Sequence, residues 1–241
     1  MFRRCLTLLT IMLVAFAGTA CREARMAAPV ELVAAIPAWN VEQTMVAGWD
    51  APFTFGPYTV KQIRRGWTKS NAWGFMGYES YQAGQSYEYL LDTGVAGKSW
   101  HCNCAVNVRQ KVLEGMVGEG KLTWEVGAGQ SLACSLRPPR DKPWRLALAA
   151  SGASNAPMQG VLEGPGLTVR VRGTDKLEGT TIPLSEPVGY VFAVMGAMDG
   201  TVGAVQVINN GVLWLPDSPQ QPALAAAAAA LLLYQDISRK P

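Results

Sequence analysis

The chain has 241 residues, of which 49% are hydrophobic and 16% are charged, a composition typical of one folded domain with a sizeable core. Its formal net charge is only +3 at pH 7, so the strong basic excess of a nucleic-acid-binding protein is missing. The composition therefore predicts a folded protein without a nucleic-acid partner.

Residues 1–20 have the features of a secretion signal. Arg3 and Arg4 give a positive start, residues 6–17 form a short apolar stretch, and small residues precede Cys21. Removal of this segment leaves 19 Lys and Arg (21 less Arg3 and Arg4) against 18 Asp and Glu. The mature chain is therefore expected to be nearly neutral and to lie in the cell envelope.

Gly18-Thr19-Ala20-Cys21 resembles the lipobox of bacterial lipoproteins, in which the cysteine is acylated and becomes the first residue. The departure is Gly18, where that pattern usually has Leu, and the alternative is ordinary signal cleavage nearby, after Ala17. The resemblance implies lipidation at Cys21 and a membrane partner through the lipid anchor. Arg22 after the cysteine implies sorting to the outer membrane, with the protein facing the periplasm. Residues 21–47 are then expected to form a tether and an irregular segment.

Residues 48–241 are predicted to form a single β-rich domain. Short alternating apolar and polar runs are separated by Gly, Pro, Asn and Asp, which is typical of strands joined by turns. Asp199-Gly200 and Asn210-Gly211 suit tight hairpin turns, and the glycine-rich stretch 115–120 is also expected to be a turn. The predicted strands are 58–65, 85–92, 99–112, 121–126, 131–136, 144–149, 158–163, 167–172, 188–194, 202–208 and 212–215.

Three cysteines of this domain are expected to face the same apolar side. Cys102 and Cys104 lie two apart on a strand, whereas His101 and Asn103 face the other way. In the oxidising periplasm we predict a disulfide between Cys104 and Cys134, with Cys102 as the alternative partner of Cys134. Because His101 points away from the thiols, neither a metal site nor a cofactor is expected.

Two groups of basic residues each surround a tryptophan. If the fold brings the groups together, they form a basic, aromatic-edged patch that suits anionic lipid headgroups. The alternative is two separate cationic turns. The predicted headgroup-binding residues are Lys61, Arg64, Arg65, Trp67, Lys69, Arg137, Arg140, Lys142, Trp144 and Arg145.

Residues 222–237 are predicted to form a C-terminal helix. No polar side chain occurs between residues 223 and 233, so the helix is apolar on every face and must be hidden from water all round. Those residues rise only ~16 Å, which is too short for a ~30 Å hydrocarbon core. The helix is therefore expected to lie inside the folded domain.

The fold class that combines these elements is mainly β. We predict a closed or nearly closed antiparallel barrel of about ten to twelve strands around the C-terminal apolar helix, because closure removes sheet edges and buries every helical face. The alternative is a β-sandwich with the helix packed on one face. That arrangement requires a polar stripe, which the central turns of the helix lack.

The last 40 or so residues resemble the tubby-like barrel family, which includes the LURP-one-related proteins and the phospholipid scramblases. The matching residues are the strand 202–208, the turn Asn209-Asn210-Gly211, the strand 212–215 and the helix with its closing Tyr234-Gln235-Asp236. The resemblance implies a helix-filled barrel that associates with phosphoinositides or other membrane lipids.

The sequence lacks common catalytic patterns. His101 is the single histidine, and no Gly-x-Ser-x-Gly motif occurs. We therefore expect a non-enzymatic binding module of the envelope, with membrane lipid headgroups as its ligand. The alternatives are a structural or accessory subunit of an envelope complex that binds a protein partner, and an enzyme of unknown class.

Overall fold

The computed structural model describes residues 23–43, 51–68, 84–106, 113–117, 120–124, 131–150, 157–180, 182, 184, 186–196 and 200–238. The predicted secretion signal, the predicted lipidation site Cys21 and the predicted headgroup-binding residue Lys69 lie outside these residues.

The described residues are mainly β-structure. The helices among them are α2 (Val30–Ala35) and α3 (Gln221–Ser238). The strands are β1 (Trp39–Asn40), β2 (Glu42–Gln43), β3 (Phe53–Phe55), β4 (Tyr58–Thr68), β5 (Gly84–Asp92), β6 (Trp100–Val106), β7 (Leu113–Val117), β8 (Gly120–Trp124), β9 (Ser131–Arg137), β10 (Trp144–Ala149), β11 (Gln159–Gly164), β12 (Leu167–Thr174), β13 (Gly189–Val194), β14 (Thr201–Gln206) and β15 (Val212–Trp214).

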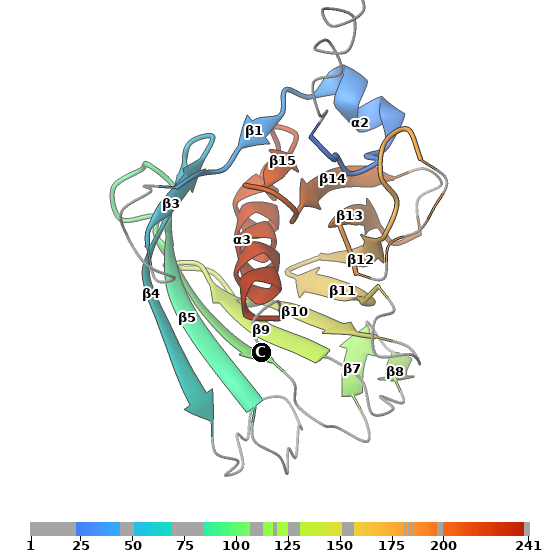
Figure 1. Cartoon of the computed structure of the whole chain (residues 1–241). Coiled ribbons are helices and arrows are strands. Elements are labelled where there is room, and N and C mark those ends of the chain that lie inside the picture. The colour runs from blue at the N-terminus through green and yellow to red at the C-terminus, as the bar shows by residue number, and fades with distance from the viewer. Residues whose placement is uncertain are drawn as a thin grey trace, which may run out of the picture.

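Thirteen strands form one antiparallel sheet that curls around α3 into a nearly closed barrel (Figure 1). The hydrogen-bonded order is β1-β15-β14-β13-β12-β11-β10-β9-β6-β5-β4-β3-β2, while β7 and β8 form a separate hairpin. The two edge strands β1 and β2 are consecutive in the chain, with only Val41 between them, and the Val41 N–H donates to the Gly211 carbonyl at 3.1 Å. The stretch 39–43 therefore pairs with both ends of the sheet. The predicted barrel is confirmed.

Buried and solvent-facing side chains alternate along the strands, as expected for a sheet with one buried face. In β6 the even-numbered residues from Trp100 to Val106 are buried, whereas His101 is exposed and Asn103 half-buried. The strand β10 repeats this pattern. Apolar side chains thus fill the inside of the barrel and leave polar and small side chains on its outer wall.

The helix α3 lies inside this wall. Every residue from Ala223 to Leu231 is at most 1% exposed. The buried leucines Leu224 and Leu231 each contribute roughly 1.5–3 kcal/mol of burial free energy, and the alanines between them keep the helix thin. The predicted burial of the helix on all sides is confirmed, and the β-sandwich alternative is wrong because no face of α3 between Ala223 and Leu231 is left for solvent.

The side chain of Gln221 fixes the start of α3. Its Nε2 donates to the carbonyls of Leu215 at 3.3 Å and Pro216 at 2.8 Å, and its Oε1 accepts from the Tyr58 hydroxyl at 3.0 Å. Since Tyr58 begins β4, these bonds link the entry of the helix both to the end of β15 and to another part of the wall.

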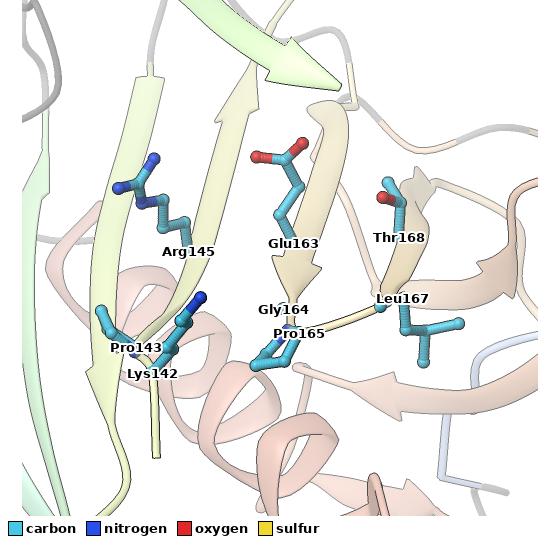
Figure 2. A pocket seen from close by; sticks show the side chains of 9 residues that line it. Lys142, Pro143, Arg145, Glu163, Gly164, Pro165, Leu167 and Thr168 are labelled. Carbon is cyan, nitrogen blue, oxygen red and sulfur yellow. The ribbon is translucent and has the colours of Figure 1, made fainter. Parts of the chain in front are cut away.

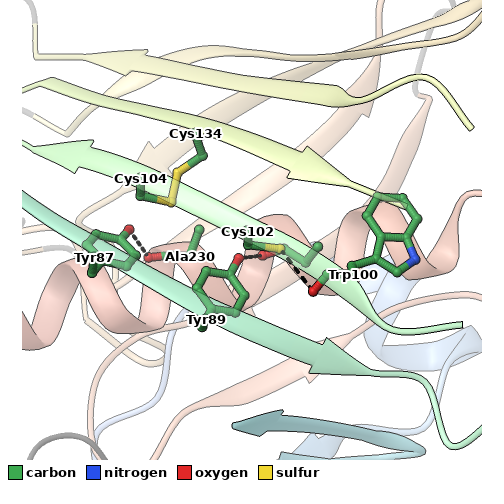
Figure 3. Close-up of a disulfide and its surroundings, with 8 residues drawn as sticks. Tyr87, Tyr89, Trp100, Cys102, Cys104, Cys134 and Ala230 are labelled. Carbon is green, nitrogen blue, oxygen red and sulfur yellow. Dashed lines mark hydrogen bonds between the residues drawn. A yellow bond between two sulfur atoms is a disulfide. The ribbon is translucent and has the colours of Figure 1, made fainter. Parts of the chain in front are cut away.

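Two tyrosines of β5 tie the wall to the middle of α3. The Tyr87 hydroxyl donates to the Ala230 carbonyl at 2.7 Å (Figure 3), and the Tyr89 hydroxyl donates to the Ala226 carbonyl at 2.6 Å. Residues two apart on a strand and four apart on a helix are both separated by roughly 6–7 Å. The spacing of the two tyrosines along β5 therefore matches the spacing of the two carbonyls along α3, so both hydrogen bonds form together. Burial raises the pKa of both phenols well above the ordinary value, which keeps their protons in place.

The different hydrogen bonding of three buried tyrosine hydroxyls leads us to expect different effects of three Tyr→Phe substitutions. Tyr87→Phe and Tyr89→Phe are each expected to lower the free energy of unfolding by about 1 kcal/mol, because each removes one buried hydrogen bond. The Tyr190 hydroxyl is buried and has no hydrogen-bond partner among the described residues, so Tyr190→Phe is expected to leave stability unchanged or to raise it. Urea unfolding measures all three. A loss for Tyr190→Phe as large as for the others would contradict this assignment.

Cys104 of β6 and Cys134 of β9 form a disulfide directly across the two strands (Figure 3). Their Cα atoms lie 4.1 Å apart. The predicted pair is confirmed, and the alternative pairing through Cys102 is wrong, since Cys102 is a free buried thiol. Burial raises the pKa of Cys102 to about 12, so this thiol stays protonated and unreactive at neutral pH.

The segment 21–47, predicted to be a tether and irregular structure, contains α2, β1 and β2. The helix α2 lies outside the barrel near β14 (Figure 1), where Leu32 packs with Met26 and Trp214 in a second buried cluster. The Met26 N–H donates to the buried side chain of Gln206 at 2.8 Å. These contacts extend the folded part of the chain back to Met26.

The turns in the structure differ in detail from the predicted hairpin turns. Between β14 and β15 the residues with positive φ are Asn209 (57°) and Gly211 (89°), so the turn is longer than the predicted Asn210-Gly211 turn. A Cβ on Gly211 would lie 2.8 Å from the Leu232 side chain of α3, which explains the glycine. Asp199 of the other predicted turn lies outside the described residues. The stretch 115–120, predicted to be a turn, contributes residues to both β7 and β8.

Candidate functional site

Outward-facing residues of the barrel wall form rows across the strands. One row consists of Lys61 on β4, Leu90 on β5, His101 on β6 and Arg137 on β9. Because neighbouring strands lie ~4.8 Å apart, Lys61 and Arg137 are separated by about 14 Å along this row. Lys61 of the first predicted basic group and Arg137 of the second therefore share the outer wall without direct contact between them.

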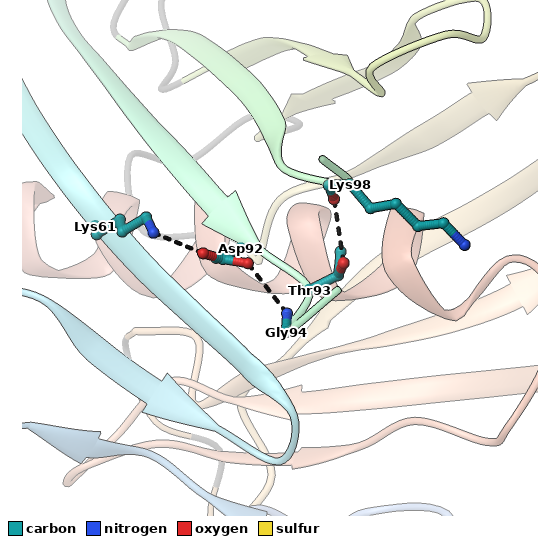
Figure 4. Close-up of polar contacts among 5 residues, drawn as sticks. All are labelled: Lys61, Asp92, Thr93, Gly94 and Lys98. Atoms are coloured by element: carbon teal, nitrogen blue, oxygen red, sulfur yellow. Dashed lines mark hydrogen bonds and ion pairs between the residues drawn. The ribbon is translucent and has the colours of Figure 1, made fainter. Parts of the chain in front are cut away.

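The cations of β4 on this wall are neutralised by acids of β5. Lys61 Nζ lies 2.6 Å from Asp92 Oδ2 (Figure 4), and Arg64 Nη1 lies 3.4 Å from Glu88 Oε1. The other Asp92 oxygen accepts from the Gly94 N–H at 3.1 Å, and the hydrogen bonds from Lys61 and Gly94 lower the pKa of Asp92. The charges of Lys61 and Arg64 are therefore already balanced within the protein.

A β-bulge decides which basic residues of β4 face outward. The strand register shifts between Lys61 and Arg64, and Gln62 within the shift has a φ of 54°. Arg65 consequently lies on the inner face of the sheet, opposite the face of Lys61 and Arg64. The backbone of Trp67 belongs to β4, and its side chain lies outside the described residues.

The second predicted group surrounds the turn between β9 and β10, residues 138–143. Arg137, Arg140, Lys142 and Arg145 are all exposed, and within the described part of the chain none of them lies within ion-pair distance of an acid. The nearest acids in the sequence and the sheet are the exposed Asp141 of the turn and Glu163, which lies opposite Arg145. Three of the six turn residues are proline, and proline fixes φ and stiffens the backbone. We call these four cations the β9–β10 basic surface.

Trp144 does not belong to that surface, in contrast to the prediction. It is 7% exposed and lies on the inner face of β10, opposite Leu136 of β9. Its ring packs against Gly164, where an added Cβ would lie 2.2 Å from Trp144 Cδ2. The prediction that Trp144 forms an aromatic edge of the basic patch is therefore wrong. Like Leu146, Trp144 is an inward-facing residue in the alternation of β10, and its ring packs at the start of this strand.

One pocket lies between the β5–β6 and β9–β10 turns, and we call it the histidine pocket. It has a volume of about 670 Å³. Its side chains supply hydrogen-bond donors and no carboxylate, a combination that suits an anion. It is lined by Gly97, Ser99, His101, Asn103, Arg137, Pro138 and Pro139.

A second pocket, of about 530 Å³, lies on the other side of the β9–β10 turn (Figure 2). Arg145, Glu163 and Thr168 lie next to one another on β10, β11 and β12, and Lys142 of the turn also lines the pocket. Burial raises the pKa of Glu163, while the positive charge of Arg145 opposes that shift. This pocket is lined by cations and an acid, so the histidine pocket is the better match to an anion.

His101 and Asn103 were not among the predicted site residues. The alternation of β6 indicates that they face outward, away from Cys102 and Cys104. What the sequence cannot supply is the pairing of His101 with Arg137, which depends on β6 and β9 being neighbours in the sheet.

Across the described ranges, no three His, Cys, Asp or Glu side chains are grouped so that they could hold a metal ion. None of the described helices has both the length and the apolar character needed to cross a membrane.

No protein-family model matches the chain, and neither a curated protein nor a solved structure matches it. The resemblance to tubby-like barrels therefore stays a prediction, and the chemistry of the outer wall is the basis for any functional assignment.

Proposed function

We propose that the chain is a non-enzymatic binding module of the bacterial cell envelope, and that its β9–β10 basic surface binds anionic membrane lipids. One contrast carries the proposal. Arg137, Arg140 and Lys142 are exposed without an ion pair among the described residues, whereas Lys61 and Arg64 on the same wall are paired with acids and Arg145 lies opposite Glu163.

The expected energetics support a lipid surface as the ligand. A Lys or Arg close to an anionic membrane contributes about 1 kcal/mol of binding free energy, so four such residues suffice for reversible association. The predicted acylation of Cys21 would hold the domain at the membrane and raise the effective concentration of headgroups at this surface. A stiff turn loses little conformational entropy when it binds.

The double substitution Arg140→Gln/Lys142→Gln tests the proposal. It is expected to weaken binding to vesicles that contain phosphatidylglycerol by about thirtyfold at low salt, because it removes two contributions of about 1 kcal/mol each. Co-sedimentation of the purified domain with vesicles measures the effect. Binding of the unsubstituted protein is expected to fall as salt is added, since screening weakens exposed charges.

The matched control is Lys61→Gln/Arg64→Gln, which removes the same charge from the same wall. Because both cations are already paired with Asp92 and Glu88, this control is expected to change vesicle affinity less than about threefold. Equal losses for the two double variants would show that net charge alone governs binding and would refute the assignment to the turn.

A second candidate is a structural or accessory subunit of an envelope complex that binds a protein partner. The outer wall of β9 and β10 favours it, because the small, half-buried residues Ala133, Ala147 and Ala149 lie on this wall in the two strands that the basic turn connects. Crosslinking in intact cells separates the two functions. A stoichiometric protein adduct at Lys142, together with no vesicle binding, would favour the partner-binding function.

A further inference from the structure

We propose that the histidine pocket is a phosphate site and that it prefers a phosphomonoester headgroup to a phosphodiester. This inference rests on the proposed function, because Arg137 belongs both to the pocket and to the β9–β10 basic surface. It adds a specific ligand group to a surface that otherwise attracts any anionic membrane.

The donors of the pocket can reach one ligand. Arg137 and His101 occupy directly opposite positions on β9 and β6, and opposite residues of an antiparallel pair have Cβ atoms about 4.5–5.5 Å apart. The planar guanidinium of Arg137 matches two phosphate oxygens at once. Ser99 and Asn103 line the same pocket and offer further hydrogen bonds.

No acid competes for these donors. None of the residues that line the pocket is Asp or Glu. Asp92 ends β5 at the adjoining turn, and its carboxylate is occupied by Lys61 and the Gly94 N–H (Figure 4). Arg137 therefore has no ion-pair partner in the described part of the chain, and an anion from solution can take that place.

A buried hydroxyl beside the pocket is also left without a partner. Ser135 lies opposite Asn103 and two residues before Arg137, on the same outward face of β9. It is only 3% exposed, and its Oγ makes no hydrogen bond to any described residue. Because this hydroxyl is hidden and Ser135 does not line the pocket, a ligand in the pocket reaches the neighbouring Asn103 and not Ser135 itself.

Both walls of the pocket are stiff. Pro138 and Pro139 restrict the β9–β10 turn. In the β5–β6 turn the Thr93 hydroxyl donates to the Lys98 carbonyl at 3.1 Å (Figure 4), and the Lys98 N–H donates to the Val95 carbonyl at 3.1 Å. The backbone on both sides of the pocket is therefore restrained before a ligand arrives, which reduces the entropy lost on binding.

The chemistry of the ligand sets the preference. A phosphomonoester carries about −1.5 to −2 charges at pH 7 and three terminal oxygens. A phosphodiester has one charge and two terminal oxygens, so it can satisfy the fork of Arg137 but leaves fewer acceptors for His101, Asn103 and Ser99. The pocket is therefore expected to select the monoester.

The first experiment uses inorganic phosphate as the probe. Since His101 is the single histidine of the chain, its imidazole nitrogens give unambiguous NMR signals. Phosphate is expected to shift these signals saturably at constant pH, whereas chloride at the same ionic strength is not. A spectrum that phosphate leaves unchanged would overturn the phosphate site.

The second experiment compares vesicles that contain phosphatidic acid, a monoester, with vesicles that contain phosphatidylglycerol, a diester, at equal total negative charge. Arg137→Lys keeps the charge and removes the fork, so it is expected to lower affinity for phosphatidic acid about tenfold. Its effect on phosphatidylglycerol is expected to be smaller, about threefold, because the diester also uses the fork of Arg137 but carries only one charge. The matched control Arg64→Lys lies on the same wall outside the pocket and is expected to change neither affinity.

The outcomes separate the pocket from the proposed function. Equal binding of both vesicles that Arg137→Lys does not alter would overturn the phosphate site and leave the anionic surface standing. Vesicles that do not bind, with a phosphate-induced shift of His101 that Arg137→Lys abolishes, would support the pocket for a soluble phosphate and overturn the membrane function. If neither vesicle binding nor a phosphate-induced shift of His101 were observed, both the phosphate site and the membrane function would be overturned. Thermal unfolding verifies that the Arg137→Lys protein is folded.

Discussion

Ala227→Asp is expected to prevent the chain from folding. Ala227 is fully buried at the centre of α3, with the barrel wall around the helix (Figure 1). A carboxylate there would lose its hydration without gaining a partner, at a cost of several kcal/mol, against a total stability of about 5–15 kcal/mol for a typical domain. Circular dichroism and size-exclusion chromatography of the variant measure the outcome.

Val33→Asp is the matched control for this substitution. Val33 lies on α2 outside the barrel and is 52% exposed, so the same change there is expected to alter the free energy of unfolding by no more than about 0.5 kcal/mol. If Ala227→Asp folded with an unchanged unfolding midpoint, α3 could not be enclosed as described.

Removal of the disulfide by Cys104→Ala/Cys134→Ala is expected to have the next largest effect. The two cysteines are separated by 30 residues, and the loop-entropy model gives about 3–4 kcal/mol for closing a loop of that length. Urea unfolding of the oxidised protein and of the double variant measures the difference.

Cys102→Ala serves as the control for the disulfide. Cys102 is equally buried on the same strand but is not bonded, so only its packing is lost, and the expected cost is below about 1.5 kcal/mol. A double variant no less stable than Cys102→Ala would contradict a structural role of the Cys104–Cys134 bond.

Features that depend on composition or strict alternation could be predicted from the sequence. An unbroken apolar helix has to be enclosed, and this requirement, together with many short strands, leads to a barrel around α3. The two-residue alternation placed Cys102 and Cys104 inside and His101 outside. These inferences succeed because each depends on neighbouring residues only.

Features that depend on pairing between distant segments could not be predicted. The closing strands β1 and β2 each have two residues, too few for a visible alternation, and their pairing is decided by β15 and β3. About ten to twelve strands were expected from the sequence, and the sheet has thirteen, because β1, β2 and the three-residue β3 add to the predicted strands, while the predicted strand 121–126 is β8 of the separate hairpin.

The same limit applies to the candidate site. All basic residues near Trp67 and Trp144 look alike in the sequence. Whether Lys61 is neutralised depends on its position beside Asp92, and the inward position of Arg65 depends on a bulge that breaks the alternation of β4. Only the cross-strand register separates the paired cations from the unpaired ones.

Hydrogen exchange of the backbone amides with and without anionic vesicles tests the central claim most directly. The account predicts slower exchange on vesicle binding at the β5–β6 turn and at residues 137–145, with no change in α3 or in the connection between β12 and β13. Vesicle-induced protection centred on α2 or on the paired cations of β4, with residues 137–145 unchanged, would contradict the assignment of the binding surface.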